Sequence, residues 1–248
     1  MFQLWRCANA GLDHRQRYLL LRKAYDNRRM YNHPMIVSDE YARIHGFFDL
    51  ISRVRGVPGD IVECGVGRGI SLACLVYAVS FGRLDKAVYS FDSFSGFPAA
   101  SVHDLGSRVV EAGKSPSGWE ETSPEMIAAI FQDDRNSARS LLRQHDVRLE
   151  IVPGFFSETL PDRLPPSIAL LHVDCDLYDS IKVVLERCLP RMSEGGMVVF
   201  DEYDDPRWPG AKKAADEVLA ASPLPIHYFE SIRRYGVMIQ SKWRQAQV

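Results

Sequence analysis

The sequence predicts an α/β fold in which a seven-stranded mixed sheet carries helices on both faces. From residue 57 onward, short apolar runs with strand character alternate with helical segments, a pattern typical of a mostly parallel sheet. Two final β runs, 227–232 and 235–241, flank Arg233 and Arg234, which predicts a closing hairpin and an antiparallel last strand. The composition, 46% hydrophobic and 25% charged, is that of a globular protein.

Residues 1–56 are predicted to form a helical extension that caps the substrate site or contacts a second copy of the chain. Ser38 could cap a helix over residues 40–54. The arginine-rich segment 15–29 has apolar residues near helical spacing, which indicates a basic amphipathic helix. Such a helix could be solvated, could pack in a dimer, or could attract an anionic substrate.

Residues 57–248 are predicted to form the main α/β domain. Its first five strands are expected at 61–66, 87–94, 148–154, 168–174 and 196–202, with helices at 70–81 and 211–220. The stretch from about 98 to 123 is rich in Ser, Gly and Pro. Because long irregular loops are usually functional or disordered, we expect a lid or substrate loop there.

A glycine-rich turn follows the first strand. Glu63 lies on that strand, Gly65 and Gly67 come after it, and Asp92 ends the next strand 27 residues after Gly65. This is roughly the spacing at which nucleotide-binding sheets place a carboxylate for ribose hydroxyls, although a simple packing turn would also explain the glycines. Glu63 would repel a pyrophosphate but suits the cationic end of S-adenosylmethionine (SAM), so the charges favour SAM over NAD.

Carboxylates also follow two later strands. Asp174 ends the fourth strand, and Asp201 and Glu202 end the fifth. Because the carboxyl ends of neighbouring parallel strands converge on the ligand crevice, these side chains are expected to lie together. Hard oxygen ligands of this kind suit Mg²⁺ or another divalent cation. The alternative is helix capping together with one ribose contact.

Three further residues near this segment are ambiguous. Asp176 is expected to be a local cap or a supporting acid, and His172 a packing histidine within the fourth strand. His103 lies in the long loop, where it could be a general base or a surface residue. Asp174 or Asp176 is the alternative base.

Five motifs together resemble the macrocin O-methyltransferase (TylF) family over roughly Met35 to Glu217. They are GDIVECGVGRGIS, YSFDSFSGFP, VPGFFSETLP, HVDCDLYDS and GGMVVFDEYDD, in this order. The resemblance implies a Rossmann-like class I methyltransferase fold and SAM-dependent, divalent-metal-dependent methylation of a hydroxyl on a sugar or small natural product. It departs from the family pattern at Asp201-Glu202, where members usually have two aspartates, and in the spacing around His103.

The resemblance also implies roles for individual residues. SAM contacts are expected from Glu63, Gly65, Gly67, Ser71, Asp92, Ser93 and Met35, the last of which could instead be plain core. Metal ligands are expected to be Asp174, Asp201 and Glu202, and catalysis is expected to involve Asp174 and His103.

Composition limits the partners. A net charge of −2 and a pI of about 6.4 give no electrostatic basis for binding nucleic acid or anionic membranes. Five cysteines without a CxxC pair indicate free thiols, and no long apolar run predicts a membrane span or signal peptide, so a cytoplasmic protein is expected. The expected partners are a small-molecule substrate and a second copy of the chain in a homo-oligomer.

Two other functions compete with methyl transfer. A NAD-dependent dehydrogenase would need a GxGxxG turn and a catalytic pair such as Tyr-xxx-Lys, and neither is convincing in this sequence. A non-catalytic protein that binds SAM or a partner is the second alternative.

Overall fold

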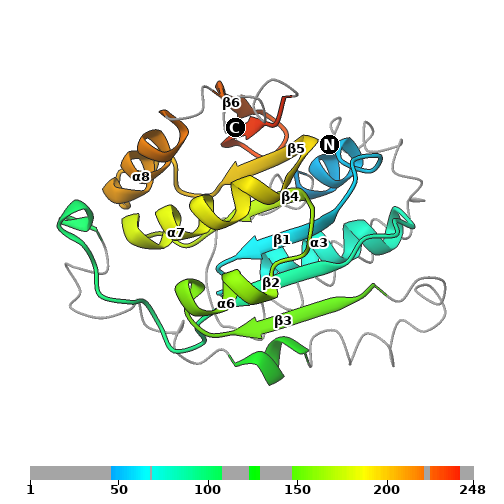
Figure 1. Cartoon of the computed structure of the whole chain (residues 1–248), viewed down its shortest axis with the longest axis horizontal. Coiled ribbons are helices and arrows are strands. Elements are labelled where there is room, and N and C mark those ends of the chain that lie inside the picture. Colours follow the sequence, from blue (N-terminus) through cyan, green and yellow to red (C-terminus); the bar gives the residue numbers. More distant parts are fainter. Residues whose placement is uncertain (1–45, 68, 108–122, 129–146, 221–223, 241–248) are drawn as a thin grey trace, which may run out of the picture.

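A seven-stranded sheet organises the molecule (Figure 1). The computed structural model describes residues 46–67, 69–107, 123–128, 147–220 and 224–240. In chain order the strands are β1 Asp60–Cys64, β2 Val88–Asp92, β3 Leu149–Pro153, β4 Ile168–Val173, β5 Met192–Phe200, β6 Ile226–Phe229 and β7 Arg234–Met238. They lie side by side as β3-β2-β1-β4-β5-β7-β6. The first five are parallel and β7 is antiparallel to both neighbours, which confirms the predicted mixed sheet.

Helices cover both faces of the sheet (Figure 1). Their bounds are α3 Ile70–Phe81, α6 Phe156–Arg163, α7 Tyr178–Cys188 and α8 Pro209–Ala220, with short 3-10 turns η2 Val102–Asp104 and η3 Leu189–Arg191. Helices α6, α7 and α8 pack on one face, and α3 packs on the other beside a helical segment at residues 46–53. Because both faces are covered, β4 is buried at every position and its sequence is almost continuously apolar.

Alternate residues of the central strands contribute to two separate cores. In β1, Val62 and Cys64 point into the core beneath α7 and α8, whereas Ile61 points into the core shared with α3. Because side chains alternate across a strand, Glu63 lies on the same face as Ile61. A carboxylate is therefore placed inside the apolar core between the sheet and α3.

Gly65 brings the first turn against the end of β4. It has a φ of 92°, and a Cβ at this position would lie 1.7 Å from the backbone oxygen of Asp174. Only glycine permits both this conformation and this approach. Gly67 also has a positive φ, of 50°, but faces open space. The glycine turn and the β4 terminus are therefore neighbours at the carboxyl edge of the sheet.

Part of the predicted N-terminal extension is described. The helical segment at 46–53 lies within the predicted helix, and its Phe47 is buried in the core next to α3. Ser38, the basic segment 15–29 and Met35 lie outside the described residues, so the domain boundary at 56 and 57 stays a prediction. None of the helices among the described residues has the length and apolar character needed to cross a bilayer.

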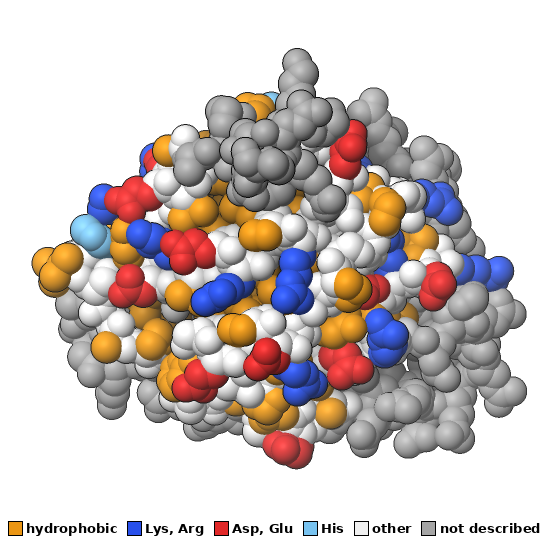
Figure 2. All heavy atoms as spheres, in the orientation of Figure 1, with side chains coloured by type: hydrophobic (Ala, Val, Ile, Leu, Met, Phe, Trp, Pro, Cys, Tyr) orange, Lys and Arg blue, Asp and Glu red, His pale blue; other side chains and the backbone are white. Residues whose placement is uncertain are grey.

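The predicted lid loop is described only up to residue 107. This first part is ordered around the η2 turn, in which Asp104 is buried. On the face shown in Figure 2, acidic and basic side chains are interspersed over the described surface. That distribution is consistent with the small net charge of the chain.

Candidate functional site

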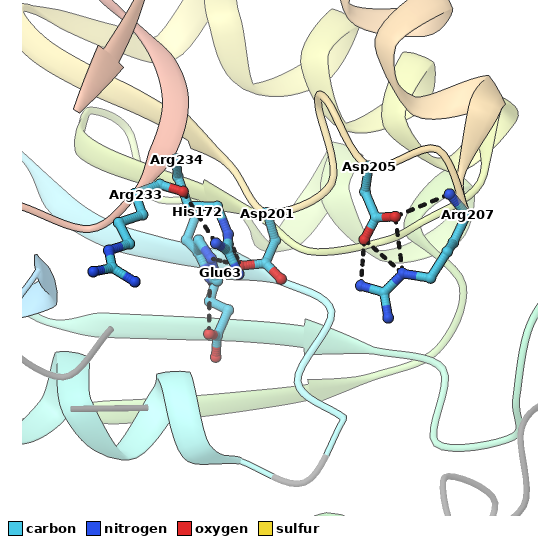
Figure 3. A network of polar contacts seen from close by, with 7 residues as sticks. All are labelled: Glu63, His172, Asp201, Asp205, Arg207, Arg233 and Arg234. Atoms are coloured by element: carbon cyan, nitrogen blue, oxygen red, sulfur yellow. Dashed lines mark hydrogen bonds and ion pairs between the residues drawn. The ribbon is translucent and has the colours of Figure 1, made fainter. Parts of the chain in front are cut away.

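A buried glutamate–histidine pair links the two central strands of the sheet (Figure 3). Glu63 of β1 is the register neighbour of His172 of β4, and both side chains are 0% exposed. Glu63 Oε1 lies 3.1 Å from His172 Nδ1. The edge of the Phe47 ring packs against the imidazole, with ring centroids 4.9 Å apart. The histidine was expected to be a packing residue, and it is buried, but it also makes this polar contact.

The histidine of this pair lies close to two of the predicted metal ligands, Asp174 and Asp201. Donor atoms of His172, Asp174 and Asp201 all lie within 4.8 Å of one another. Backbone bonds fix the two aspartates, because Asp174 N donates to Cys64 O and Asp201 N donates to Val173 O, each at 2.9 Å. The structure therefore brings Asp174 and Asp201 together at the carboxyl ends of β4 and β5, as predicted from their positions after neighbouring strands.

Positive charge surrounds this cluster. Arg234, the first residue of β7, bonds Asp201 Oδ1 through Nε at 2.9 Å (Figure 3). Burial works to lower the pKa of His172, but contacts with Asp201 and Glu63 and the nearby charge of Asp174 outweigh it and raise that pKa to about 9. Among the described residues, the imidazolium of His172 and the guanidinium of Arg234 compensate the partly buried carboxylates of Asp174 and Asp201.

Glu202 adds a third carboxylate. Its side chain is buried, and burial together with the charges of Asp201, Asp174 and Asp176 raises its pKa well above the usual value. Its Oε2 has no hydrogen-bond partner among the described residues. Mutually repelling carboxylates, one of them with an unpaired buried oxygen, are a donor set that fits a divalent cation.

Asp92 holds the glycine turn in place. Its Oδ2 accepts hydrogen bonds from the backbone N–H groups of Val66 at 2.7 Å and Gly67 at 3.3 Å, and its Oδ1 accepts one from Phe94 N at 2.8 Å. The hydroxyl of Ser93 donates to the Gly96 carbonyl at 2.6 Å. The predicted ribose ligand therefore lies at the edge of the predicted cofactor turn.

The other predicted SAM contacts lie in different surroundings. Ser71 is buried in the first turn of α3, directly after the glycine turn. Glu63 is enclosed behind the turn and bonded to His172, and Met35 lies outside the described residues. Each of these contacts with SAM stays a prediction.

Asp104 connects the start of the lid loop to α7 through hydrogen bonds. Its Oδ1 accepts a hydrogen bond from the backbone N–H of Tyr178 at 2.9 Å, and its Oδ2 accepts from Ser101 N and Oγ at 2.9 and 2.8 Å. The neighbouring His103 packs its ring against Tyr178, with centroids 4.3 Å apart. This places the candidate base His103 at the start of α7, which directly follows the 174–177 loop.

Arginine residues near the site were not predicted from the sequence. Arg234 begins β7, the hairpin strand that pairs with β5, and Arg207 pairs with Asp205 in the loop after β5 (Figure 3). The hydrogen bonds with Asp205 raise the pKa of Arg207, and the charges of Glu202 and Asp176 add to this effect. Of the three basic residues His172, Arg207 and Arg234, only His172 had a position in the sequence that could have indicated a place in the site. It lies two residues before Asp174 and thus on the same face of an extended strand.

The cysteines of the described residues form no disulfide and are buried: Cys64, Cys74, Cys175 and Cys188. Burial raises the pKa of the Cys64 and Cys175 thiols well above the usual value. Protonated thiols are poor nucleophiles, so neither of these two cysteines is suited to nucleophilic catalysis.

Solved structures share the fold. The O-methyltransferase NovP superposes with a TM-score of 0.65 and 26% identity, covering 80% of both chains. The calicheamicin methyltransferase CalS11 superposes with a TM-score of 0.66 and 22% identity, covering 92% of this chain and 93% of that one. The fold is therefore the Rossmann-like methyltransferase fold that the sequence resemblance implied.

Characterised relatives are similar over part of their length. A tetracenomycin 4'-O-methyltransferase of Streptomyces olivaceus is 34% identical over 150 residues, which are 60% of this chain and 54% of the relative. The mycinamicin III 3''-O-methyltransferase of Micromonospora griseorubida is 33% identical over 151 residues, 60% of this chain and 56% of the relative. The matches thus span little more than half of these relatives.

The family comparison extends over most of the chain. The model of the macrocin O-methyltransferase (TylF) family matches residues 9–236, a range that includes the glycine turn, the carboxylate cluster and the lid loop. The chain belongs to the macrocin O-methyltransferase (TylF) family.

Proposed function

We propose that this protein transfers a methyl group from SAM to a hydroxyl of a sugar or small natural product with the help of a divalent cation. The observation that carries the proposal is the convergence of Asp174 and Asp201 beside the glycine turn at Gly65. Family membership favours this hypothesis over the dehydrogenase alternative. The relatives named as tetracenomycin and mycinamicin O-methyltransferases support a glycosylated natural product as the acceptor.

The cofactor would lie over the turn after β1. Asp92 is already fixed by three backbone N–H donors, so its carboxylate is preorganised at the position expected for ribose recognition. Ser71 and Ser93 flank the same turn at the start of α3 and after β2. Preorganised groups reduce the entropy cost of binding, which supports a SAM site here.

The carboxylate cluster would hold the cation. Asp174 and Asp201 are the first candidates. Glu202 is the third, because burial and the charges of the neighbouring carboxylates raise its pKa, and a cation would offset both effects. Mg²⁺ or another divalent ion would supply positive charge that orients the acceptor and lowers the pKa of its hydroxyl.

Proton removal from the acceptor requires a base at the same edge. Asp176 is buried and has a φ of 60°. After burial and the nearer aspartates, its charge also contributes to the raised pKa of Glu202. Asp176 and Asp174 are therefore the favoured bases, and His103 at the start of α7 is the alternative. Positioning would contribute much of the rate, up to roughly 7–11 kcal/mol for well-aligned reactants.

Other properties follow from the same proposal. The SAM-binding domain would comprise residues 57–248, and the segment 1–56 would cap the site or mediate a homo-oligomer. The buried free thiols suit a reducing compartment, which supports a cytoplasmic location. Neither nucleic acid nor a membrane is proposed as a partner, given the small net charge.

Formation of S-adenosylhomocysteine tests the proposal. The full chain is incubated with SAM, Mg²⁺ and a panel of hydroxylated glycosides, before and after chelation. Asp174→Asn is expected to abolish turnover while SAM still binds, and Asp162→Asn, an exposed aspartate in α6, serves as the matched control. Unchanged turnover in Asp174→Asn, or in protein from which the metal has been removed by chelation, would contradict the proposal that a divalent cation takes part in catalysis. A thermal shift with NADH but not SAM would favour the dehydrogenase instead.

A further inference from the structure

We propose that His172 binds the divalent cation directly through Nε2, which adds one nitrogen to the carboxylate ligands and gives a site that prefers Mn²⁺ or Co²⁺ to Mg²⁺. The inference rests on the metal-dependent function proposed above and concerns the identity of its ligands and ion. Imidazole nitrogen favours first-row transition ions, whereas a site of oxygen ligands alone suits Mg²⁺.

The first support is a buried polar atom that makes no hydrogen bond. His172 Nε2 is buried, and it has no hydrogen-bond partner among the described residues. Asp201 Oδ1 lies 3.9 Å away, which is within ion-pair range of a protonated imidazole but beyond hydrogen-bond reach. A buried polar atom without a partner carries a free-energy cost, and a ligand placed between the imidazole and the carboxylates would remove it.

The spacing of the donors supports a shared ion. The donor atoms of His172, Asp174 and Asp201 lie within 4.8 Å of one another. Two donors at about 2.1 Å from one ion lie about 3–4 Å apart, depending on the angle between them. Small side-chain rotations would therefore bring the three atoms to coordination distance without moving the strands.

Glu63 contacts the imidazole of His172 on the side away from Asp174 and Asp201. It lies 3.1 Å from the other ring nitrogen, Nδ1, and is fully buried. Metal-bound histidines commonly donate their second N–H to a carboxylate, which fixes the tautomer and the ring orientation. Binding of the cation requires the neutral imidazole, so the proton on Nε2 leaves as the ion binds. With the remaining proton on Nδ1, the lone pair of Nε2 is directed toward Asp174 and Asp201. Glu63 then acts as a positioning residue for the ligand His172.

The competing arrangement is an imidazolium that pairs with Asp201 while carboxylates alone bind the ion. The two arrangements differ in whether nitrogen touches the metal. In the competing case, loss of the histidine would change Mg²⁺ and Co²⁺ affinity alike, because only charge is removed. In the proposed case, loss of the histidine would lower the affinity for Co²⁺, which favours nitrogen ligands, much more than the affinity for Mg²⁺.

Pulsed electron paramagnetic resonance on the full chain with Mn²⁺ and ¹⁵N-labelled histidine tests direct contact. We expect a nitrogen hyperfine coupling of a directly bound imidazole, lost in His172→Asn and kept in His227→Asn, an exposed histidine of β6. Bound Mn²⁺ without this coupling, or no binding of Mn²⁺, would overturn the assignment. The wild-type spectrum decides even if His172→Asn fails to fold.

Calorimetric titration with Mg²⁺ and Co²⁺ provides the second measurement. His172→Asn should lower Co²⁺ affinity at least 10-fold more than Mg²⁺ affinity, and Glu63→Gln should lower Co²⁺ affinity about 10-fold while the nitrogen coupling persists. Equal losses for both ions would contradict the inference and leave the carboxylate site intact. Nitrogen coupling in a protein that forms no S-adenosylhomocysteine would instead contradict the proposed function alone.

Discussion

Replacing Asp104 by alanine should release the first part of the lid loop from α7. Its buried carboxylate accepts one hydrogen bond from Tyr178 N and two from Ser101. The bond to Tyr178 also caps an N–H at the start of α7, where the first four amides have no helical partner. The residue thus joins a loop and a helix that are 74 positions apart.

The expected loss follows from what each bond connects. The Ser101 bonds lie within the loop, so water can replace them once the loop swings out. The Tyr178 bond couples loop and helix; a hydrogen bond to a charged acceptor contributes about 1.5–3 kcal/mol, and loss of a cap costs about 0.5–2 kcal/mol. Because both figures describe the same bond, they do not add. We expect Asp104→Ala to lower the free energy of unfolding by about 2 kcal/mol.

Urea denaturation measures this change, and limited proteolysis reports the local release of the loop. Ser101→Ala is the matched control. It removes two loop-internal bonds, from Ser101 Oγ to Asp104 Oδ2 and from His103 N to Ser101 Oγ, and leaves the Tyr178 contact, so it should cost less than about 1 kcal/mol. An unfolding free energy for Asp104→Ala within about 0.5 kcal/mol of the wild type, with unchanged cleavage of the loop, would refute the reasoning.

Three further outcomes are expected. Gly65→Ala should destabilise the fold by more than about 3 kcal/mol in urea denaturation, because its Cβ would meet the backbone of Asp174, whereas Gly67→Ala should cost about 1 kcal/mol; similar losses would contradict the close approach. Asp92→Ala should weaken SAM binding at least 10-fold by calorimetry, and unchanged affinity would exclude a ribose contact. Pairing with Arg207 lowers the pKa of Asp205 below 3.8, so the stability from this pair is complete above pH 3.8 and lost as the pH falls through the folded pKa. Asp205→Asn should therefore flatten the acid-unfolding profile there, by less than about 1 kcal/mol for so exposed a pair; an unchanged profile would contradict the assignment.

The strand positions could be predicted because apolar runs bounded by glycine or polar residues carry most of the signal. The boundaries of β5 were less accurate, since the strand begins at Met192 whereas the prediction began at residue 196. Its first part contains Ser, Glu and two glycines, and its pairing with β4 shifts register between Ile168 and Leu170. A bulge of this kind depends on the partner strand and leaves no local pattern.

The site was predictable where it depended on strand order alone. Asp174 and Asp201 end adjacent parallel strands, and their convergence follows from that topology. The contact between His172 and Glu63 requires the register of β1 against β4, and that of Arg234 with Asp201 requires β7 to lie beside β5. Both facts arise from pairing between segments far apart in the chain, which single-strand patterns do not encode.

The buried polar pair explains why local pattern and fold disagree at this point. Glu63 and His172 occupy positions that packing alone would fill with apolar side chains, as their neighbours Ile61 and Leu170 do. Burying two ionisable groups costs free energy unless all their polar atoms are hydrogen-bonded, and His172 Nε2 has no hydrogen-bond partner among the described residues. Violations of the core pattern of this kind concentrate at functional sites. Glu63 and His172 interrupt the apolar pattern of β1 and β4 and so weaken the sequence signal for these strands. The same two residues connect the core to the carboxylates of the proposed metal site.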